Sequence, residues 1–191
     1  LCSIDRVSAS ANMNNRLSEA IVEAYKSTNG APISFELMLK CYQSRMKDAN
    51  NDDSISSVLK QLVNAHIFES EDKVSLIDDS YIIKMDGYPK DGPIAKAIVY
   101  FLMSKLNNIY ELLDKQAVND EVVQIRHFSI IDEAHYMLDF DNRPLRNLIA
   151  VGRNKGLSII LATQNMSSFK SKGFDFYANA QYPLIMKQQT I

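Results

Sequence analysis

The stretch HFSIIDEAHYMLDF, residues 127–140, decides how the chain is interpreted, because a run of apolar residues ends directly in two carboxylates. Ile130 and Ile131 are typical of a buried strand, and Asp132 and Glu133 follow at its end. Carboxylates at the tip of a buried strand are unfavourable unless a positive group meets them. Mg²⁺ with a nucleoside triphosphate is a common partner of such acids, so the stretch predicts a nucleotide site.

The composition limits the classes of protein to consider. The chain has 191 residues, of which 46% are hydrophobic, so it is long enough to bury a core. Its formal net charge of -2 argues against a generally basic nucleic-acid coat, although a few lysines on one loop can still contact DNA. Cys2 and Cys41, without a CxxC pair, are typical of a reduced, cytoplasmic protein. No apolar run reaches the roughly 18 residues of a membrane span, so no membrane partner is expected.

The first part of the chain has the periodicity of short amphipathic helices. NRLSEAIVEAYKST and APISFELMLKCYQSRM each place apolar residues on one helical face. Ser34 is predicted to cap the second helix, and Asp53 or Ser54 to cap a third, SISSVLKQLVNAHIF. Three such helices are compatible with a winged helix, but the third has no basic residue beyond Lys60. A helical insertion covering one edge of a sheet is therefore favoured.

From residue 80 onward, strand and helix patterns alternate. Strands are predicted at 80–86, 122–132, 157–164 and 180–187, and helices at 92–116, opened by Pro93, and at 143–156, closed by glycine. This alternation predicts βαβ units, and hence an α/β fold with a parallel sheet and flanking helices. We therefore expect two parts, a helical subdomain or insertion at 1–79 and a sheet-containing core at 80–191.

The carboxyl ends of parallel strands gather at one edge of a sheet, which is where ligands bind. Asp132 is expected to hold Mg²⁺ through a water molecule, and Glu133 to orient and deprotonate the water that attacks the γ-phosphate of ATP. Thr163 and Gln164 end the next strand, where a polar side chain can touch both the γ-phosphate and that water. An apolar strand followed by two acids also occurs by chance, and this second polar strand end is what favours a nucleotide site. His135 is expected to hydrogen-bond around the acids, since no second His or Cys lies at metal-ligand spacing.

Two segments extend this pattern: SIIDEAHYML is followed by LIAVGRNKGLSIILATQNMSSF. Together they resemble the DEAH, GRxxG and ATQ runs of the HerA/FtsK-like P-loop ATPases, and among them the HerA-type DNA translocases and helicases. The resemblance is specific over residues 128–169, and residues 15–69 are similar to the helical insertion of the family. It implies a partial RecA/HerA-like P-loop NTPase core with an N-terminal helical insertion. It also suggests the DptH/DndH-like, DNA phosphorothioation-dependent restriction proteins.

The resemblance implies a motor that couples ATP hydrolysis to DNA translocation or unwinding. The family forms rings, usually hexamers, with ATP sites between subunits, and a nuclease or restriction protein is a further implied partner. On this basis Glu133 is the catalytic base, Gln164 the sensor, and Arg153 a finger that reaches the γ-phosphate bound by a neighbouring subunit. Arg153 is equally compatible with capping a helix end or pairing with Asp139 or Asp141.

The segment NMSSFKSKGFDF, residues 165–176, is a candidate DNA contact. Lys170 and Lys172 stand among three phenylalanines, a combination that single-stranded nucleic acid favours. Loops after parallel strands are more often solvated turns, and such phenylalanines more often belong to the core. Both interpretations stay open.

The sequence lacks the phosphate-binding loop G-x-x-x-x-G-K-[ST] that a P-loop ATPase requires. In the nearest imitation, GYPKDGPI at 87–94, Pro93 stands where the lysine is needed and has no amide hydrogen. Because the chain begins with Leu1 rather than Met, we expect the loop to lie upstream and the chain alone to bind nucleotide poorly. The alternative is a degenerate HerA-like scaffold or regulatory subunit that binds a nuclease without hydrolysing ATP. A DEAH-box helicase of superfamily two is disfavoured, because its third motif is SAT and it has no counterpart of GRNKG.

Overall fold

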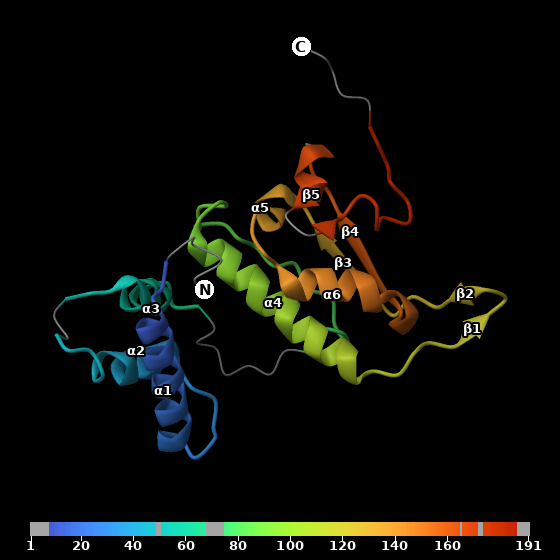
Figure 1. Cartoon of the computed structure of the whole chain (residues 1–191). Helices are drawn as coiled ribbons and strands as arrows, with labels where there is room; N and C mark the ends of the chain where they lie inside the picture. The colour runs from blue at the N-terminus through green and yellow to red at the C-terminus, as the bar shows by residue number, and fades with distance from the viewer. Residues whose placement is uncertain (1–7, 49–50, 68–74, 165, 172–173, 187–191) are drawn as a thin grey trace, which may run out of the picture. The chain divides into compact units, whose positions relative to one another are not determined.

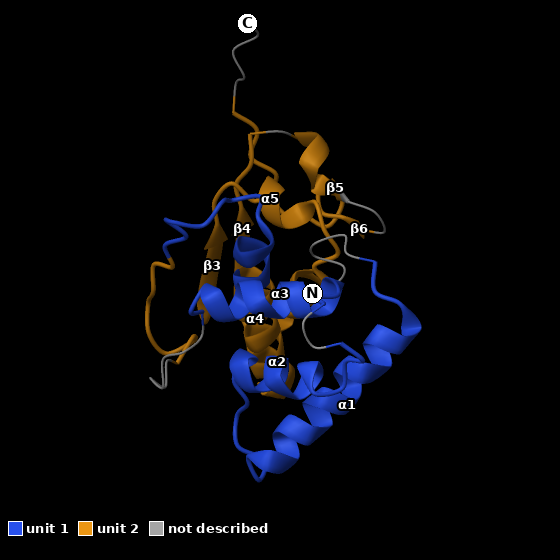
Figure 2. Ribbon diagram, turned by 90° about the vertical axis from the view of Figure 1, so that its left-hand side faces the viewer, with its two compact units in different colours: residues 1–74, 84–98 blue, residues 75–83, 99–191 orange. Residues whose placement is uncertain are grey.

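The computed structural model describes residues 8–48, 51–67, 75–164, 166–171 and 174–186 (Figure 1). The chain divides into two compact units, residues 1–74 with 84–98 and residues 75–83 with 99–191 (Figure 2). Each unit contains a hydrophobic cluster of its own. In the part of the chain that the structure describes, no helix is both long enough and apolar enough to cross a bilayer.

The first unit contains the helices α1 (Ala11–Ser27), α2 (Phe35–Gln43) and α3 (Ser54–Asn64). The prediction of three short helices is confirmed, and so is the N-cap at Ser34, whose side chain accepts a hydrogen bond from the amide of Leu37. On α3, Lys60 Nζ lies 2.7 Å from a carboxylate oxygen of Asp52. The single basic residue of this helix is therefore paired with an acid, which weighs against a DNA-reading winged helix.

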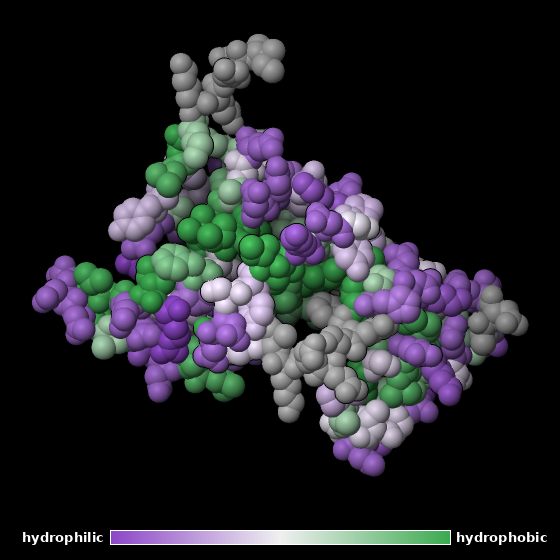
Figure 3. Space-filling model, turned by 180° about the vertical axis from the view of Figure 1, so that it is seen from behind, coloured by the Kyte–Doolittle hydropathy of each residue, from purple (hydrophilic) through white to green (hydrophobic). Residues whose placement is uncertain are grey.

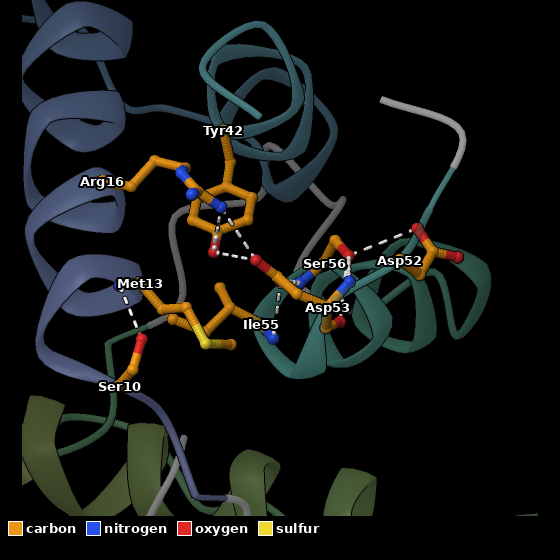
Figure 4. Close-up of polar contacts among 8 residues, drawn as sticks. All are labelled: Ser10, Met13, Arg16, Tyr42, Asp52, Asp53, Ile55 and Ser56. Atoms are coloured by element: carbon orange, nitrogen blue, oxygen red, sulfur yellow. Dashed lines mark hydrogen bonds and ion pairs between the residues drawn. The ribbon is translucent and has the colours of Figure 1, made fainter. Parts of the chain in front are cut away.

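The three helices meet at Asp53, the N-cap of α3 (Figure 4). Its Oδ1 accepts hydrogen bonds from the amides of Ile55 and Ser56, at 3.1 and 2.9 Å, and the Ser56 hydroxyl accepts one from the Asp53 amide. Its Oδ2 accepts from the Tyr42 hydroxyl of α2 at 2.6 Å and from Arg16 of α1 at 2.9 Å. One carboxylate thus holds all three helices together, and the capping box confirms the predicted cap.

The same contacts shift the pKa values of Tyr42 and Asp53. Burial, followed by the hydrogen bond and negative charge of Asp53, raises the pKa of Tyr42 to about 12. Burial acts to raise the pKa of Asp53, but the hydrogen bonds from Tyr42, Ser56 and Ile55 and the charge of Arg16 together hold it below its usual value. Ionised Asp53 is therefore the form that the folded unit prefers.

We expect Asp53→Ala to lower the free energy of unfolding by about 3 kcal/mol, because it removes a helix cap and leaves Tyr42 and Arg16 without their shared acceptor. Chemical denaturation monitored by circular dichroism measures the change. Because the pKa of Asp53 is lowered on folding, its contribution is present at neutral pH and is lost as the pH falls through the folded pKa. The Asp53→Ala variant should lose less stability on acidification than the wild type, and an equal loss would contradict this assignment.

The second unit contains the parallel strand pair. The long helix α4 (Pro93–Leu112) begins in the first unit and continues into the second from residue 99. The elements that follow it are β1 (Val118–Asn119), β2 (Val122–Val123), β3 (His127–Ile131), α5 (His135–Leu138), α6 (Arg143–Val151), the 3-10 helix η1 (Arg153–Lys155), β4 (Leu157–Leu161), the 3-10 helix η2 (Met166–Phe169), β5 (Lys170–Ser171) and β6 (Phe174–Asp175). β3 and β4 pair in parallel, with His127 opposite Leu157 and Ile131 opposite Leu161 (Figure 1). The prediction of a mixed α/β fold is confirmed, as is the start of a long helix at Pro93.

One face of the β3–β4 pair packs on helices. The buried cluster of this unit combines residues of α4, α5 and α6 with Leu157, and Ile131, Ile159 and Leu161 pack against it. Among the described residues, the parallel sheet contains two strands, while β1–β2 and β5–β6 form separate antiparallel pairs. The larger parallel sheet expected from the sequence is therefore reduced to its two central predicted strands.

Three predicted strands are wrong in whole or in part. Residues 80–86 form no strand, and neither do residues 180–186, while residue 187 lies outside the described part. The predicted strand at 122–132 is interrupted, because β2 turns back on β1 and β3 begins only at His127. Asp120 and Glu121 form the turn with φ values of 50° and 64°. Two adjacent residues with positive φ are typical of a tight hairpin turn, which usually has Asn, Asp or Gly at the first of these positions and Gly at the second.

His127 opens β3 with a partly buried ring. Its ring stacks on that of Tyr110, with centroids 6.3 Å apart, and its Nδ1 is buried with no hydrogen-bond partner in the described part of the chain. Burial lowers the pKa of His127 below its usual value. Protonation of this ring therefore favours the unfolded chain.

We expect the free energy of unfolding to fall as the pH drops below about 6.5, because the unfolded chain then binds a proton that the folded His127 binds less readily. His127→Phe keeps the aromatic contact with Tyr110 and removes the titration. The free energy of unfolding, measured by urea denaturation between about pH 5 and about pH 7.5, should change less with pH for this variant than for the wild type. If the free energy of unfolding changes equally with pH in both proteins, His127 is not the cause of the pH dependence.

Candidate functional site

The backbone brings the carboxyl ends of β3 and β4 together. Beyond the strands, the amide of Ala162 donates to the carbonyl of Ile131 at 3.0 Å, and the amide of Ala134 donates to the carbonyl of Ala162 at 2.8 Å. These bonds continue the parallel ladder past its last residues. The acidic turn after β3 is therefore fixed against the segment that follows β4.

Glu133 and Gln164 are in direct contact at this edge. Gln164 Nε2 donates a hydrogen bond of 2.8 Å to Glu133 Oε1. Thr163 precedes Gln164 in the same segment and is half-buried. Two polar residues that are 31 positions apart in sequence are thus brought together at the tips of adjacent parallel strands.

The backbone of Glu133 is in the left-handed region, with φ of 49°. This conformation is uncommon for a residue other than glycine and costs roughly 1–2 kcal/mol. Asp132 supports it, because its Oδ1 accepts a hydrogen bond of 2.8 Å from the amide of Glu133. Strained residues held by their surroundings occur preferentially at functional sites, so this turn is a candidate site on backbone evidence as well.

His135 lies beside the same carboxylate. Its Nδ1 is 3.3 Å from Glu133 Oε2, and each of the two side chains is 29% exposed. The contact has the distance of an ion pair for a protonated ring, but Nδ1 makes no hydrogen bond within the described residues. The expected hydrogen bond from His135 to the acids is therefore not formed. The ring packs instead against Tyr136, with centroids 4.1 Å apart.

The site offers few ligands for a metal ion. No group of three or more His, Cys, Asp or Glu side chains within the described ranges is arranged to hold one. Asp132 is exposed, and one of its oxygens is already bonded to the Glu133 amide. The expected contact of Asp132 with Mg²⁺ through water stays a prediction.

The GRNKG segment, residues 152–156, is largely structural. A Cβ atom on Gly152 would lie 2.5 Å from the carbonyl oxygen of Leu148, and one on Gly156 would lie 2.7 Å from that of Gln124. Gly156 also has φ of 81°. Both glycines are therefore required by close packing, and the second also by its backbone conformation.

Lys155 of the same segment holds the end of α4. Its Nζ donates to the carbonyl oxygens of Tyr110 and Glu111, at 2.6 and 2.9 Å. A lysine near the carboxyl end of a helix satisfies carbonyls that lack intrahelical partners. The sequence analysis missed this role, since Lys155 is 45 positions from Tyr110 and no local pattern indicates the contact.

Like its neighbour Asn154, Arg153 is exposed. Its side chain makes no hydrogen bond or ion pair within the part of the chain that the structure describes, and Asp141 pairs with Arg146 instead. Because Leu157 lies opposite His127, Arg153 precedes the amino end of β4, whereas Glu133 follows the carboxyl end of β3. The structure therefore does not bring Arg153 to Glu133 within one chain.

In the candidate DNA segment, residues 165–176, the phenylalanines and the lysines have different surroundings. Phe176 is 5% exposed, its ring packs on Phe174 at 4.7 Å, and Phe169 and Phe174 contact the hydrophobic cluster. These rings pack in or against the core, which is the second of the two interpretations left open by the sequence. Lys170 is exposed at the start of β5, and Lys172 lies outside the described residues. A role for the two lysines in DNA binding stays a prediction.

Comparisons of the sequence with models of protein families and with curated proteins found no match to this chain.

Proposed function

We propose that this chain is the part of a HerA/FtsK-like ATPase motor that contains the water-activating acid and the sensor, and that the motor uses ATP hydrolysis to translocate along or unwind DNA. The observation that supports the proposal most is the 2.8 Å hydrogen bond between Gln164 and Glu133. It joins the tips of two adjacent parallel strands, which is the place where α/β sheets bind ligands.

The proposed chemistry assigns one task to each side chain. Asp132 would hold Mg²⁺ through water, and the bound ion would supply charge neutralisation at the phosphates of ATP. Glu133 accepts a proton from the attacking water at its carboxylate. The amide of Gln164 has a second hydrogen and a carbonyl oxygen, so it can hold Glu133 and still contact the water or the γ-phosphate. Thr163 is the neighbouring hydroxyl on the same strand end.

Arg153 is proposed to act on another subunit. Its exposed position at the amino end of β4 is at the opposite end of the strands from Glu133 of the same chain. A ring, in our proposal a hexamer, with ATP sites between subunits allows the arginine of one chain to meet the site of the next. The exposure of Arg153 and the structural roles of its neighbours in GRNKG support this assignment.

A complete motor needs elements that these 191 residues do not contain. The sequence has no phosphate-binding loop, and the two parallel strands among the described residues are fewer than a stable sheet usually has. We therefore propose that the loop and further strands of a RecA/HerA-like core come from outside this sequence. The buried free thiol of Cys41 is compatible with a cytoplasmic protein. Processing or restriction of foreign DNA, beside a nuclease partner, is the proposed setting.

The second candidate function is a scaffold or regulatory subunit that keeps the fold without hydrolysing ATP. The absence of a phosphate-binding loop from the sequence favours it. ATP hydrolysis by the whole gene product, measured with and without duplex DNA, separates the two functions. If the protein is a motor, it hydrolyses ATP and duplex DNA increases the rate. If the whole gene product hydrolyses no ATP and its full sequence has no phosphate-binding loop, the protein is the scaffold.

A further inference from the structure

The open face of the β3–β4 pair is formed by Phe128, Ile130 and Ile160. These side chains are 56%, 68% and 45% exposed, while the residues that alternate with them pack on the helices. Ile130 and Ile160 are register partners, so they stand side by side on this face. Parallel sheets are normally covered on both faces. Apolar side chains also gather at the surface in the view from behind (Figure 3).

A second unpartnered apolar surface lies near the end of the described chain. The tail, residues 180–186, has the sequence AQYPLIM and contains no charged residue. Tyr182, Leu184, Ile185 and Met186 are 82%, 91%, 66% and 85% exposed. The tail therefore does not cover the open face of its own chain. Tyr182, Leu184 and Met186 recur at every second position, as on one side of an extended segment, and Ile185 falls between them. Pro183 restricts the tail to the border of a sheet or to a docked extended segment.

We propose that the tail of a second copy of this chain covers the open face, and that two copies exchange tails reciprocally. Both surfaces are uncharged and apolar, so neither presents a charge that the other must neutralise. Both are also carried by every copy, which is what a two-fold interface requires. The proposal does not depend on the ATPase function.

The buried area favours reciprocal exchange over a single contact. In an extended tail Tyr182, Leu184 and Met186 share one side and Ile185 points away, so one tail on one face combines three and three large side chains, each with roughly 100 Å² left to bury, or about 600 Å². Stable interfaces bury about 1,200–2,000 Å² in total. A single contact falls short of this range, whereas two symmetric contacts reach its lower end, about 1,200 Å².

The test is the mass of the 191-residue chain in sedimentation equilibrium between about 1 and about 100 μM, with far-UV circular dichroism as the check on folding. We expect a dimer for the wild type and monomers for Ile130→Glu and Leu184→Glu. Ile82→Glu is the matched control, because Ile82 is 90% exposed in the same unit but belongs to neither surface. It should stay dimeric.

Mixing the two monomeric variants tests the reciprocal exchange itself. The Ile130→Glu chain keeps an intact tail and the Leu184→Glu chain keeps an intact face, so a mixture retains one of the two contacts. We expect mixed dimers that form at least about tenfold more weakly than the wild type. A monomeric wild type, a dimeric Leu184→Glu, a monomeric Ile82→Glu, or a mixture that does not associate would each overturn the proposal. Adding Leu184→Glu to the monomeric Ile130→Glu chain should leave its melting temperature unchanged. A lower melting temperature would overturn the proposal too, because the tail would then lie on its own sheet.

Discussion

Glu133→Gln is expected to slow ATP hydrolysis by the whole protein by roughly 10²- to 10⁴-fold while ATP still binds. Glutamine has nearly the same shape and can keep a hydrogen bond to Gln164, but it cannot accept the proton of the attacking water. Steady-state phosphate release measures the turnover, and titration with a fluorescent ATP analogue measures binding.

The matched control for this variant is Glu121→Gln. Glu121 is a second glutamate with positive φ, but it lies in the β1–β2 turn and not at the carboxyl ends of β3 and β4. Its turnover should equal that of the wild type. Unchanged turnover of Glu133→Gln would refute the assignment of the base, and a loss of turnover in both variants would indicate a general effect of the substitution.

Arg153→Ala is expected to lower turnover by about 10³-fold or more, the effect of removing an arginine finger. Because the guanidinium has no partner within the described residues, the free energy of unfolding should change by less than about 0.5 kcal/mol. Lys105→Ala, which removes an exposed basic side chain from α4, is the control and should leave turnover unchanged.

Mixed rings test whether Arg153 acts between subunits. Glu133→Gln subunits retain Arg153, and Arg153→Ala subunits retain Glu133. Where the two kinds of subunit are neighbours, a site between them can contain both intact residues. Mixing should therefore restore part of the turnover that each variant lacks alone. No recovery, in rings shown by mass to contain both subunits, would contradict a finger supplied by the neighbouring chain.

Local signals in the sequence predicted the elements that depend on local physics. The caps at Ser34 and Asp53 and the helix start at Pro93 were predicted because each depends on residues within one turn. The parallel pairing of β3 and β4 followed from the helix between two apolar runs. The contact between Glu133 and Gln164 then followed from the rule that the carboxyl ends of parallel strands share an edge.

The remaining features depend on contacts distant in sequence or on unusual backbone conformations. Short apolar runs predicted strands at 80–86 and 180–187, but a strand also needs a neighbouring strand, which the described structure does not provide there. The β1–β2 turn has Glu121 at positive φ, where a tight hairpin turn usually has Gly. The role of Lys155 depends on the end of α4, with Tyr110 lying 45 positions away.

The central claim is that the acids after β3 and the glutamine after β4 surround the γ-phosphate of ATP. A crystal structure of the whole protein with Mg²⁺ and a non-hydrolysable ATP analogue tests it most directly. We expect Glu133 and Gln164 within hydrogen-bond reach of the γ-phosphate or its attacking water, about 3 Å directly or through one water, and Asp132 beside the Mg²⁺. A nucleotide bound elsewhere, with the Glu133–Gln164 edge facing no phosphate, would contradict the account.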